Sequence, residues 1–234
     1  MFVGSPAYPA DDADRQTVVI AGLRLPLRAT IAIAVTTFVL LFDYSRTFLP
    51  ELVESPPSAV SSLIVGGERI VLFGVVPAAV IVLGFRDRLP RYGLTLGDWR
   101  AGVALIALGL AVMIPVVLWF ATLPDARTYY APVANPLLAL IVANALDLSA
   151  AEFLFRGFLM LTLIRAIGPI GVLVAAVPFV MTHLGKPELE LFSTLGGGTI
   201  YGWLAWRTGS IVWGAAAHIV ILTLVSVAAA GAAA

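Results

Sequence analysis

The chain has 234 residues, of which 60% are hydrophobic and 12% are charged, and its mean hydropathy is +1.00. This composition excludes a soluble globular domain and is typical of a protein that crosses a membrane several times. The formal net charge is zero and the sequence contains no cysteine, which excludes disulfides, thiolate nucleophiles and cysteine-based metal sites. Any chemical site must therefore use Glu, Asp, His, Ser or the backbone.

Residues 1–22 are rich in Pro, Ala and Asp and lack a basic start, so we expect a mobile tail or surface piece rather than a signal peptide. Residues 23–234 form the predicted transmembrane domain. It contains seven apolar stretches, each near the ~20 residues that a helix needs to cross a bilayer, with the sixth one short. The predicted spans are residues 26–49, 70–85, 101–121, 136–164, 169–184, 193–207 and 210–230, with loops around 51–57, 86–100 and 123–135. The expected fold is an all-α bundle of about seven transmembrane helices around a central polar cavity within the membrane.

The distribution of basic residues predicts a cytoplasmic amino terminus. With seven spans in this orientation, nine basic residues lie on the inner side and four on the outer side, as the positive-inside rule favours. The inner set is Arg15, Arg24, Arg28, Arg86, Arg88, Arg91, Arg100, Arg165 and Arg207, and the outer set is Arg46, Arg69, Arg127 and Lys186. We therefore expect an integral protein of the cell membrane whose carboxyl terminus lies outside.

Residues 147–160, with the sequence DLSAAEFLFRGFLM, place two opposite charges inside a long apolar stretch. Glu152 and Arg156 are four residues apart, so they lie on one helical face and can form an ion pair. Burying an ionisable residue at membrane depth costs at least a few kcal/mol, so such a residue indicates a functional site by default. A structural clamp between helices is the alternative.

The only two histidines, His183 and His218, both fall within predicted spans. A rise of ~1.5 Å per helical residue places Glu152 and His183 at similar depth and His218 about two turns closer to the cytoplasm. A Glu and two His that converge there could activate water against a peptide carbonyl, or bind a divalent metal that does so, and His218 could also donate to the oxyanion. Alternatively, each histidine is only an interhelical hydrogen-bonding group.

Four more residues are candidates for accessory roles. Phe179 lies one helical turn before the first histidine, on the same face. Lys186 and Glu190 follow that histidine, in a run that a solvated, proline-containing turn explains equally well. Asp147 lies above the Glu-Arg motif on the same helix and either lines the cavity or caps a helical segment. The glycines of the predicted sixth span indicate close helix packing rather than phosphate binding.

Together these motifs resemble the CPBP family, the CAAX prenyl protease and bacteriocin-processing membrane proteins. This family is also called Abi and includes the Ras-converting endopeptidases. The similarity covers about residues 70–230 and rests on the order and spacing of the motifs, including the upstream run YGLTLGDWR at residues 92–100. The motifs are Glu152-x-x-x-Arg156-Gly157, Phe179-x-x-x-His183 and a final-helix His218.

The resemblance implies an all-helical intramembrane endopeptidase in which Glu and His activate water and a further His and an Asn bind the oxyanion. Our leading hypothesis for this chain is that Glu152 is the base or a ligand, Arg156 orients it, His183 shares the water and His218 stabilises the oxyanion. The expected substrate is a membrane-associated or prenylated peptide, the other expected partners are membrane lipids, and no nucleic acid is expected. No cofactor is expected; a divalent metal such as zinc, if one binds, would use Glu152, His183 and His218.

The sequence departs from the family pattern at two positions. The first of two adjacent glutamates, the one that the family assigns as the base, is replaced by Ala151, and the Asn four residues after the final His is replaced by Leu222. The chain thus resembles a subgroup with a single Glu in the first motif. Either Glu152 serves as the base, or Glu190 replaces the lost carboxylate. The alternatives are an engineered change at Ala151, or a catalytically impaired member that acts as a membrane binding, immunity or scaffold protein.

Overall fold

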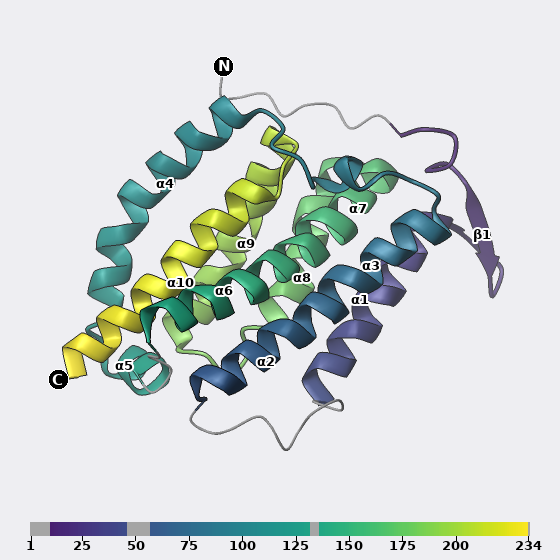
Figure 1. Ribbon diagram of the computed structural model, residues 1–234. Helices are drawn as coiled ribbons and strands as arrows, with labels where there is room; N and C mark the ends of the chain where they lie inside the picture. Colours follow the sequence, from purple (N-terminus) through teal and green to yellow (C-terminus); the bar gives the residue numbers. More distant parts are fainter. Residues whose placement is uncertain (1–9, 46–56, 132–135, 234) are drawn as a thin grey trace.

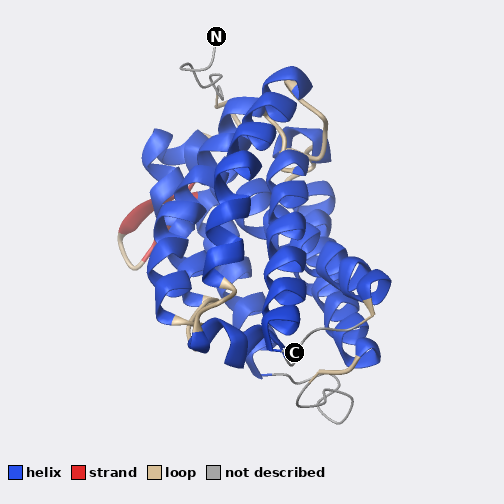
Figure 2. Ribbon diagram, turned by 90° about the vertical axis from the view of Figure 1, so that its left-hand side faces the viewer, coloured by secondary structure: helices blue, strands red, loops and turns tan. Residues whose placement is uncertain are grey.

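The structure is a computed structural model that describes residues 10–45, 57–131 and 136–233. Within this part it is a helical bundle with a short β-hairpin near the amino terminus (Figures 1 and 2), which confirms the predicted all-α transmembrane fold. The hairpin consists of β1 (Thr17–Ile20) and β2 (Leu23–Pro26). The α-helices are α1 (Leu27–Ser45), α2 (Ala59–Arg69), α3 (Val76–Ala79), α4 (Trp99–Phe120), α5 (Pro124–Tyr130), α6 (Leu137–Glu152), α7 (Leu161–Ile167), α8 (Gly171–Met181), α9 (Glu188–Thr208) and α10 (Val212–Ala233). Wider π-helical segments are η2 (Ile70–Val75), η3 (Val80–Gly84) and η6 (Phe153–Met160), and the 3₁₀ turns are η4 (Leu89–Tyr92) and η7 (Gly168–Ile170).

The bundle is organised around one continuous rod, α6–η6–α7. Every residue from Ala150 to Arg165 in this rod is buried. A helix that is apolar on all sides is stable only where neighbours enclose it. The rod packs against α1, α2, α8, α9 and α10. In Figure 1 it crosses the middle of the molecule, with α4 and α10 on one side and α1, α2 and α3 on the other. The Glu-Arg motif is therefore held in the most enclosed part of the protein.

Five described stretches are long and apolar enough to cross a membrane: Leu27–Ser45, Ala59–Gly84, Trp99–Phe120, Leu137–Met181 and Val212–Gly231. The fourth stretch is a hairpin, because Gly168, with a φ of 75°, ends α7 and α8 returns along η6. In their described residues all seven predicted spans are mainly helical, but α8 has only 11 residues and α9 is not among the five. Seven membrane crossings therefore stay a prediction.

Two helical segments extend beyond the predicted spans. The second helix begins at Ala59 instead of residue 70, after Ser58 accepts a hydrogen bond from the Ser61 N–H as a cap. The polar run at residues 66–69 hid this extension. The short helix α5 lies in the predicted loop 123–135. The predicted loop at 51–57 falls mostly outside the described residues.

The described part of the amino-terminal segment is anchored to the bundle. Residues 1–9 lie outside the described part, but Asp14 is buried and accepts hydrogen bonds from Arg28 and Arg91 at 2.8 and 2.6 Å. The antiparallel hairpin pairs Thr17 with Pro26 and leads directly into α1. This segment, expected to be a tail or surface piece, is thus fixed from Asp14 onward.

An ionic cluster fixes this end of the molecule. Asp87 accepts from Arg28 at 3.0 Å and from Arg91 at 2.6 Å. Burial opposes ionisation of Asp14 and Asp87, but backbone and arginine hydrogen bonds outweigh it and lower the pKa of both carboxyls. Arg165 joins the cluster at 3.5 Å from Asp14. Three arginines assigned to the inner side thus meet at one end of the bundle, although the orientation in the membrane stays a prediction.

We predict that Asp87→Asn destabilises the protein at neutral pH by about 2 kcal/mol, because it removes charge-assisted hydrogen bonds to two arginines. The pKa of Asp87 in the folded state lies below its usual 3.8. The stabilisation is therefore complete above pH 3.8 and is lost as the pH falls through the lower, folded-state pKa. Thermal unfolding in detergent between pH 7 and pH 3 should show the gap between wild type and variant closing at the acid end. Asp125→Asn, at an exposed position in α5, is the control, and an equal effect of both variants would contradict the prediction.

Candidate active site

Glu152 and Arg156 form a buried ion pair where α6 passes into η6. Arg156 Nη1 lies 3.1 Å from Glu152 Oε1, and the two residues are 0% and 2% exposed. The spacing of four residues correctly predicted this pair. Arg156 Nη2 also donates to the Gly198 carbonyl at 3.4 Å, which links the rod to α9. The wider turns of η6 begin directly after Glu152, and such π-helical segments are frequent at functional sites.

The two oxygens of the Glu152 carboxylate have different surroundings. Oε1 also accepts from His218 Nδ1 at 3.2 Å, whereas Oε2 makes no hydrogen bond to any described residue. A carboxylate only accepts hydrogen bonds, so Nδ1 of His218 carries a hydrogen, and Nε2 is an acceptor in the neutral ring and a donor in the imidazolium. Gly214 lies beside Oε2, where a Cβ atom would come within 3.3 Å of that oxygen. Glu152 thus has one oxygen held in place and one available for chemistry.

His183 is oriented by the backbone at the end of α8. Its Nδ1 lies 3.0 Å from the Phe179 carbonyl, which is an obligate acceptor, so Nδ1 carries the hydrogen. Thr182 also donates to this carbonyl, at 2.7 Å. The residue is 7% exposed. Its Nε2 is therefore a fixed, largely desolvated acceptor.

Phe179 brings the two imidazoles and the guanidinium together. Its ring centroid lies 4.7 Å from that of His183 and 6.0 Å from that of His218. Arg156 Cζ lies 3.8 Å from the same ring centroid, in cation–π geometry. The residues predicted to converge from three separate helices thus lie around one aromatic ring. Close packing of aromatic side chains, rather than an open cavity, surrounds them in the described structure.

Tyr201 is a site residue that the sequence reasoning missed. Its ring stacks on His218 at 5.3 Å with an interplanar angle of 22°, and Arg156 Cζ lies 5.7 Å from its centroid. The only signal in the sequence was a tyrosine within the glycine-rich α9, where Gly198 lies one turn away. A Cβ at Gly198 would lie 3.0 Å from the Phe179 ring. The glycines therefore let α9 approach closely enough for Tyr201 to reach the histidine.

His218 lies closer to Glu152 than the predicted offset of two turns allowed. That prediction placed the turn between α9 and α10 level with Arg165. Instead, the Ile211 N–H donates to the Gly93 carbonyl at 3.1 Å, and the adjacent Tyr92 carbonyl lies 2.6 Å from the position of a Cβ on Gly157. The turn thus lies beside Gly157, deeper in the bundle. Glu152 lies five residues from Gly157, or about 8 Å along the helix, and His218 lies seven residues from Ile211, or about 11 Å. The two residues are therefore at similar depth, and their side chains meet.

Lys186 and Glu190 form a second polar group. Lys186 Nζ lies 2.8 Å from Glu190 Oε1, and the Tyr130 hydroxyl donates to Oε2 at 2.6 Å. Burial and the nearby Glu190 carboxylate raise the pKa of Tyr130, so it is a neutral donor. Both Glu190 oxygens are thus engaged: Oε2 holds α5 against the start of α9, and Oε1 pairs with Lys186.

Asp147 belongs to a clamp between helices. Arg69 Nη1 lies 2.8 Å from Asp147 Oδ1, and Arg69 Nε lies 2.9 Å from Asp43 Oδ1. One arginine on α2 therefore fixes α6 to α1. Of the two roles left open for Asp147, these contacts favour a structural one.

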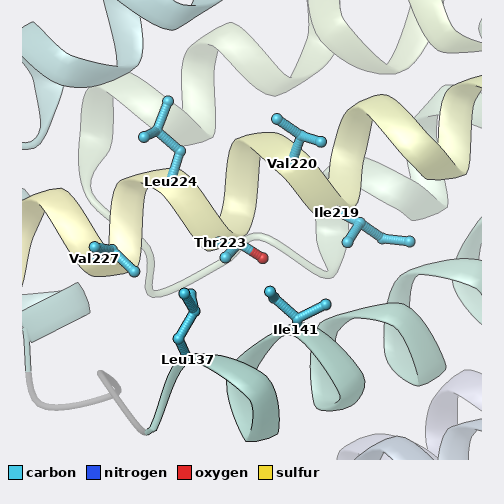
Figure 3. Close-up of a pocket in the computed structure, with 7 residues that line it drawn as sticks. All are labelled: Leu137, Ile141, Ile219, Val220, Thr223, Leu224 and Val227. Atoms are coloured by element: carbon cyan, nitrogen blue, oxygen red, sulfur yellow. The ribbon is translucent and has the colours of Figure 1, made fainter.

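A groove lies between α6 and α10, and neither Glu152 nor Arg156 lines it (Figure 3). Its volume is about 350 Å³. Leu137 and Ile141 of α6 face α10 across it, and the Thr223 hydroxyl lies between the two helices. Asn144 donates to this hydroxyl at 3.0 Å. The lining residues are Leu137, Ile141, Ile219, Val220, Thr223, Leu224 and Val227.

Comparison with protein-family models matches residues 133–224 to the type II CAAX prenyl endopeptidase Rce1-like family. The match includes Glu152, Arg156, Phe179, His183 and His218. Over these residues the chain is similar to the CAAX protease family. The match and the five long apolar helices together support an integral membrane protein. No curated protein and no solved structure matches the chain.

Whether a metal ion binds at this site stays a prediction. The described residues contain no group of three His, Asp or Glu side chains placed to hold one metal ion. A catalytic zinc site usually takes three protein ligands. Nδ1 of each histidine is engaged, in one case with the Phe179 carbonyl and in the other with Glu152, which leaves Nε2 as the ring nitrogen available to a ligand.

We predict that Glu152→Leu lowers the free energy of unfolding by about 3–5 kcal/mol, because it leaves the buried Arg156 charge without a partner. The double variant Glu152→Leu/Arg156→Met removes both charges and should recover more than half of that loss. Unfolding in detergent micelles by titration with a denaturing detergent measures both changes.

Glu188→Leu is the matched control, since this glutamate is exposed at the start of α9 and should shift stability by less than about 0.5 kcal/mol. The free energy of unfolding that the double variant loses is compared with the sum of the losses in Glu152→Leu and Arg156→Met. Equal values would show that the two charges do not stabilise each other.

Proposed function

We propose that the protein hydrolyses a peptide bond of a prenylated, membrane-associated peptide, with Glu152 as the general base. The observation that carries the proposal is the free Oε2 of a fully buried carboxylate whose other oxygen is held by Arg156 and His218. A buried carboxylate oxygen that no protein group engages is an acceptor at which a water molecule can bind. This atom would bind and deprotonate that water.

His183 is the second partner for that water. Its Nε2 is an acceptor, because the Phe179 carbonyl fixes the hydrogen on Nδ1. Two acceptors, Glu152 Oε2 and His183 Nε2, then bind the two hydrogens of one water and direct its oxygen lone pair at the substrate carbonyl. Positioning of this kind and proton removal together supply much of the rate enhancement of a hydrolase.

Glu152 both removes the proton from water and returns it to the leaving group. The water oxygen forms a bond to the carbonyl carbon while Glu152 takes one of its protons. The tetrahedral intermediate collapses with cleavage of the C–N bond, and Glu152 delivers that proton to the leaving amine. The products are a carboxylic acid and an amine. Arg156 keeps Glu152 ionised between turnovers, and His218 orients it through Oε1 and donates to the oxyanion when Nε2 is protonated.

The two departures from the family pattern fit this assignment. Leu222 packs in an apolar cluster with Val117, Ala121 and Tyr130, so its position contributes no amide. Ala151 is buried in the core beside Glu152. The first-motif carboxylate that remains is therefore the one whose oxygen is free, whereas Glu190 has both oxygens engaged. These contacts favour Glu152 over Glu190 as the base.

Substrate entry requires a conformational opening. Glu152 is 0% exposed, and Gly198 of α9 and Gly214 of α10 lie against the pair. α9 and α10 must therefore separate from the rod to admit a peptide. Gating of this kind by moving helices commits the substrate and keeps bulk water away from the site.

We predict that Glu152→Gln and His183→Ala each lower kcat/KM for a farnesylated peptide at least about 100-fold in proteoliposomes, the usual contribution of a general base. Glu190→Gln should lose much less, because its carboxylate holds α5 and not the water. Mass spectrometry of the products gives the rates and the cleaved bond.

A strong metal chelator in the same assay should leave the wild-type rate unchanged. Intact turnover in Glu152→Gln would refute the proposal. Tight binding of the peptide by the wild type without any cleavage would instead assign the chain to a binding or immunity role.

A further inference from the structure

We infer that Tyr201 is a positioning residue that fixes the ring plane of His218 and thereby sets the direction of its Nε2. The two rings are stacked, with centroids 5.3 Å apart and an interplanar angle of 22°. Tyr201 comes from α9 and His218 from α10, so the contact joins two helices across the site. Its consequence for catalysis rests on the proposed function, in which Nε2 of His218 donates to the oxyanion.

The hydrogen bond to Glu152 does not by itself define the orientation of His218. Nδ1 lies 3.2 Å from Glu152 Oε1. The second side-chain torsion of histidine has a broad energy profile, so the side chain alone holds its ring plane only weakly. A single contact at Nδ1 also lets the ring tilt about that point, and Nε2 moves with the tilt. A second contact is therefore needed to aim Nε2.

The aromatic neighbours of His218 supply this second contact. His183 is held by its own helix, since its Nδ1 lies 3.0 Å from the Phe179 carbonyl one turn earlier. His218 instead bonds to a side chain of a different helix. Phe179 lies nearly perpendicular to the His218 ring, with centroids 6.0 Å apart and an angle of 73°, whereas Tyr201 lies nearly parallel to it. Tyr201 is thus the neighbour that restrains tilting of the imidazole.

Close packing of α9 holds Tyr201 in place. A Cβ atom at Gly202, the next residue, would lie 3.0 Å from the Met160 sulfur of the central rod. Three residues before Tyr201, the Gly198 carbonyl accepts a hydrogen bond from Arg156 at 3.4 Å. The guanidinium of Arg156 also lies 5.7 Å from the Tyr201 ring centroid, within the range of a cation–π contact. The register of α9 is therefore fixed on both sides of the tyrosine.

These contacts assign the role to the aromatic ring of Tyr201 rather than to its hydroxyl. The ring makes both the stacking contact with His218 and the cation–π contact with Arg156. Within the part of the chain that the structure describes, no residue is hydrogen-bonded to the hydroxyl. Phenylalanine should therefore replace Tyr201 in this role. A flexible aliphatic side chain should not, because it has no planar face against which the imidazole can lie.

The kinetic test compares Tyr201→Leu with Tyr201→Phe on a farnesylated peptide in proteoliposomes. We expect Tyr201→Leu to lower kcat at least about tenfold and to leave KM within about threefold, since a misaimed oxyanion donor weakens mainly the transition state. Tyr201→Phe should keep both constants within about threefold of the wild-type values. The control is Tyr44→Leu, which removes a tyrosine that is 89% exposed on α1 and should change neither constant. Equal losses of kcat in Tyr201→Phe and Tyr201→Leu would assign the effect to the hydroxyl and overturn the inference.

Nuclear magnetic resonance of the imidazoles tests the geometry without turnover. The chain has only two histidines, so isotope labelling of histidine gives two sets of ring signals, which His183→Gln assigns. In detergent micelles we expect Tyr201→Leu to shift and broaden the His218 ring signals, because the ring current of Tyr201 and the fixed ring plane are both lost. Tyr201→Phe should preserve these signals. The His183 signals should stay unchanged in each variant and so report that the protein is folded.

The spectra separate the stacking role from the proposed function. Unchanged His218 signals in Tyr201→Leu would overturn the inference. If altered His183 signals show that this variant is misfolded, Tyr201→Met takes its place under the same criteria, because methionine adapts to irregular space. The expected change in the His218 signals, together with no turnover by the wild type, would support the stacking role and refute only the proposed function.

Discussion

The buried ion pair of Glu152 and Arg156 is the constraint on which the rest of the structure depends. Glu152 is 0% and Arg156 2% exposed, so both charges have lost their hydration. The attraction between the two charges rarely offsets this loss of hydration free energy by itself. The fold adds further contacts: His218 to Oε1, the Gly198 carbonyl to Nη2, and the face of Phe179 to the guanidinium. These contacts come from three other helices. Holding the pair therefore fixes how α8, α9 and α10 meet the central rod.

The same requirement explains where small and aromatic residues occur around the rod. A Cβ at Gly157 would approach the Tyr92 carbonyl within 2.6 Å, and one at Gly202 would lie 3.0 Å from the Met160 sulfur. Small residues let helix backbones come close within a membrane, where apolar surface gains little by packing against other apolar surface. Close approach in turn lets flat rings, rather than flexible chains, surround the charges. The arrangement is closely packed because backbone contacts and aromatic rings enclose the charges.

Much of the fold and part of the site could be predicted from the sequence, since both depend on local signals. Apolar stretches predicted the helices, and the spacing of four residues predicted the ion pair. The position of His218 relative to Glu152 could not be predicted by counting rise from helix ends. It depends on the loop at residues 89–98, which enters the bundle and holds the turn between α9 and α10. Such tertiary contacts leave no periodic pattern in the sequence.

Accessory residues were harder still to assign, because their roles depend on partners far away in the chain. Asp147 and Glu190 were equivalent candidates on sequence grounds. In the structure both carboxylates are already paired, since Arg69 engages one while Lys186 and Tyr130 engage the other. Tyr201 gave almost no signal, yet it stacks on a histidine of the site. The distinguishing property is whether a carboxylate oxygen is already satisfied, which only the assembled helices determine.

This property also bears on how a single glutamate can replace an adjacent pair. Two carboxylates side by side in a low-dielectric site repel each other, so one of them is readily kept protonated. A lone carboxylate beside an arginine has no such competitor and stays ionised. Its two oxygens can then divide the work: Oε1 is fixed by Arg156 and His218 while Oε2 is free to accept a proton. The loss of the first glutamate at Ala151 is therefore compatible with base catalysis, provided that the fixed oxygen keeps its two partners.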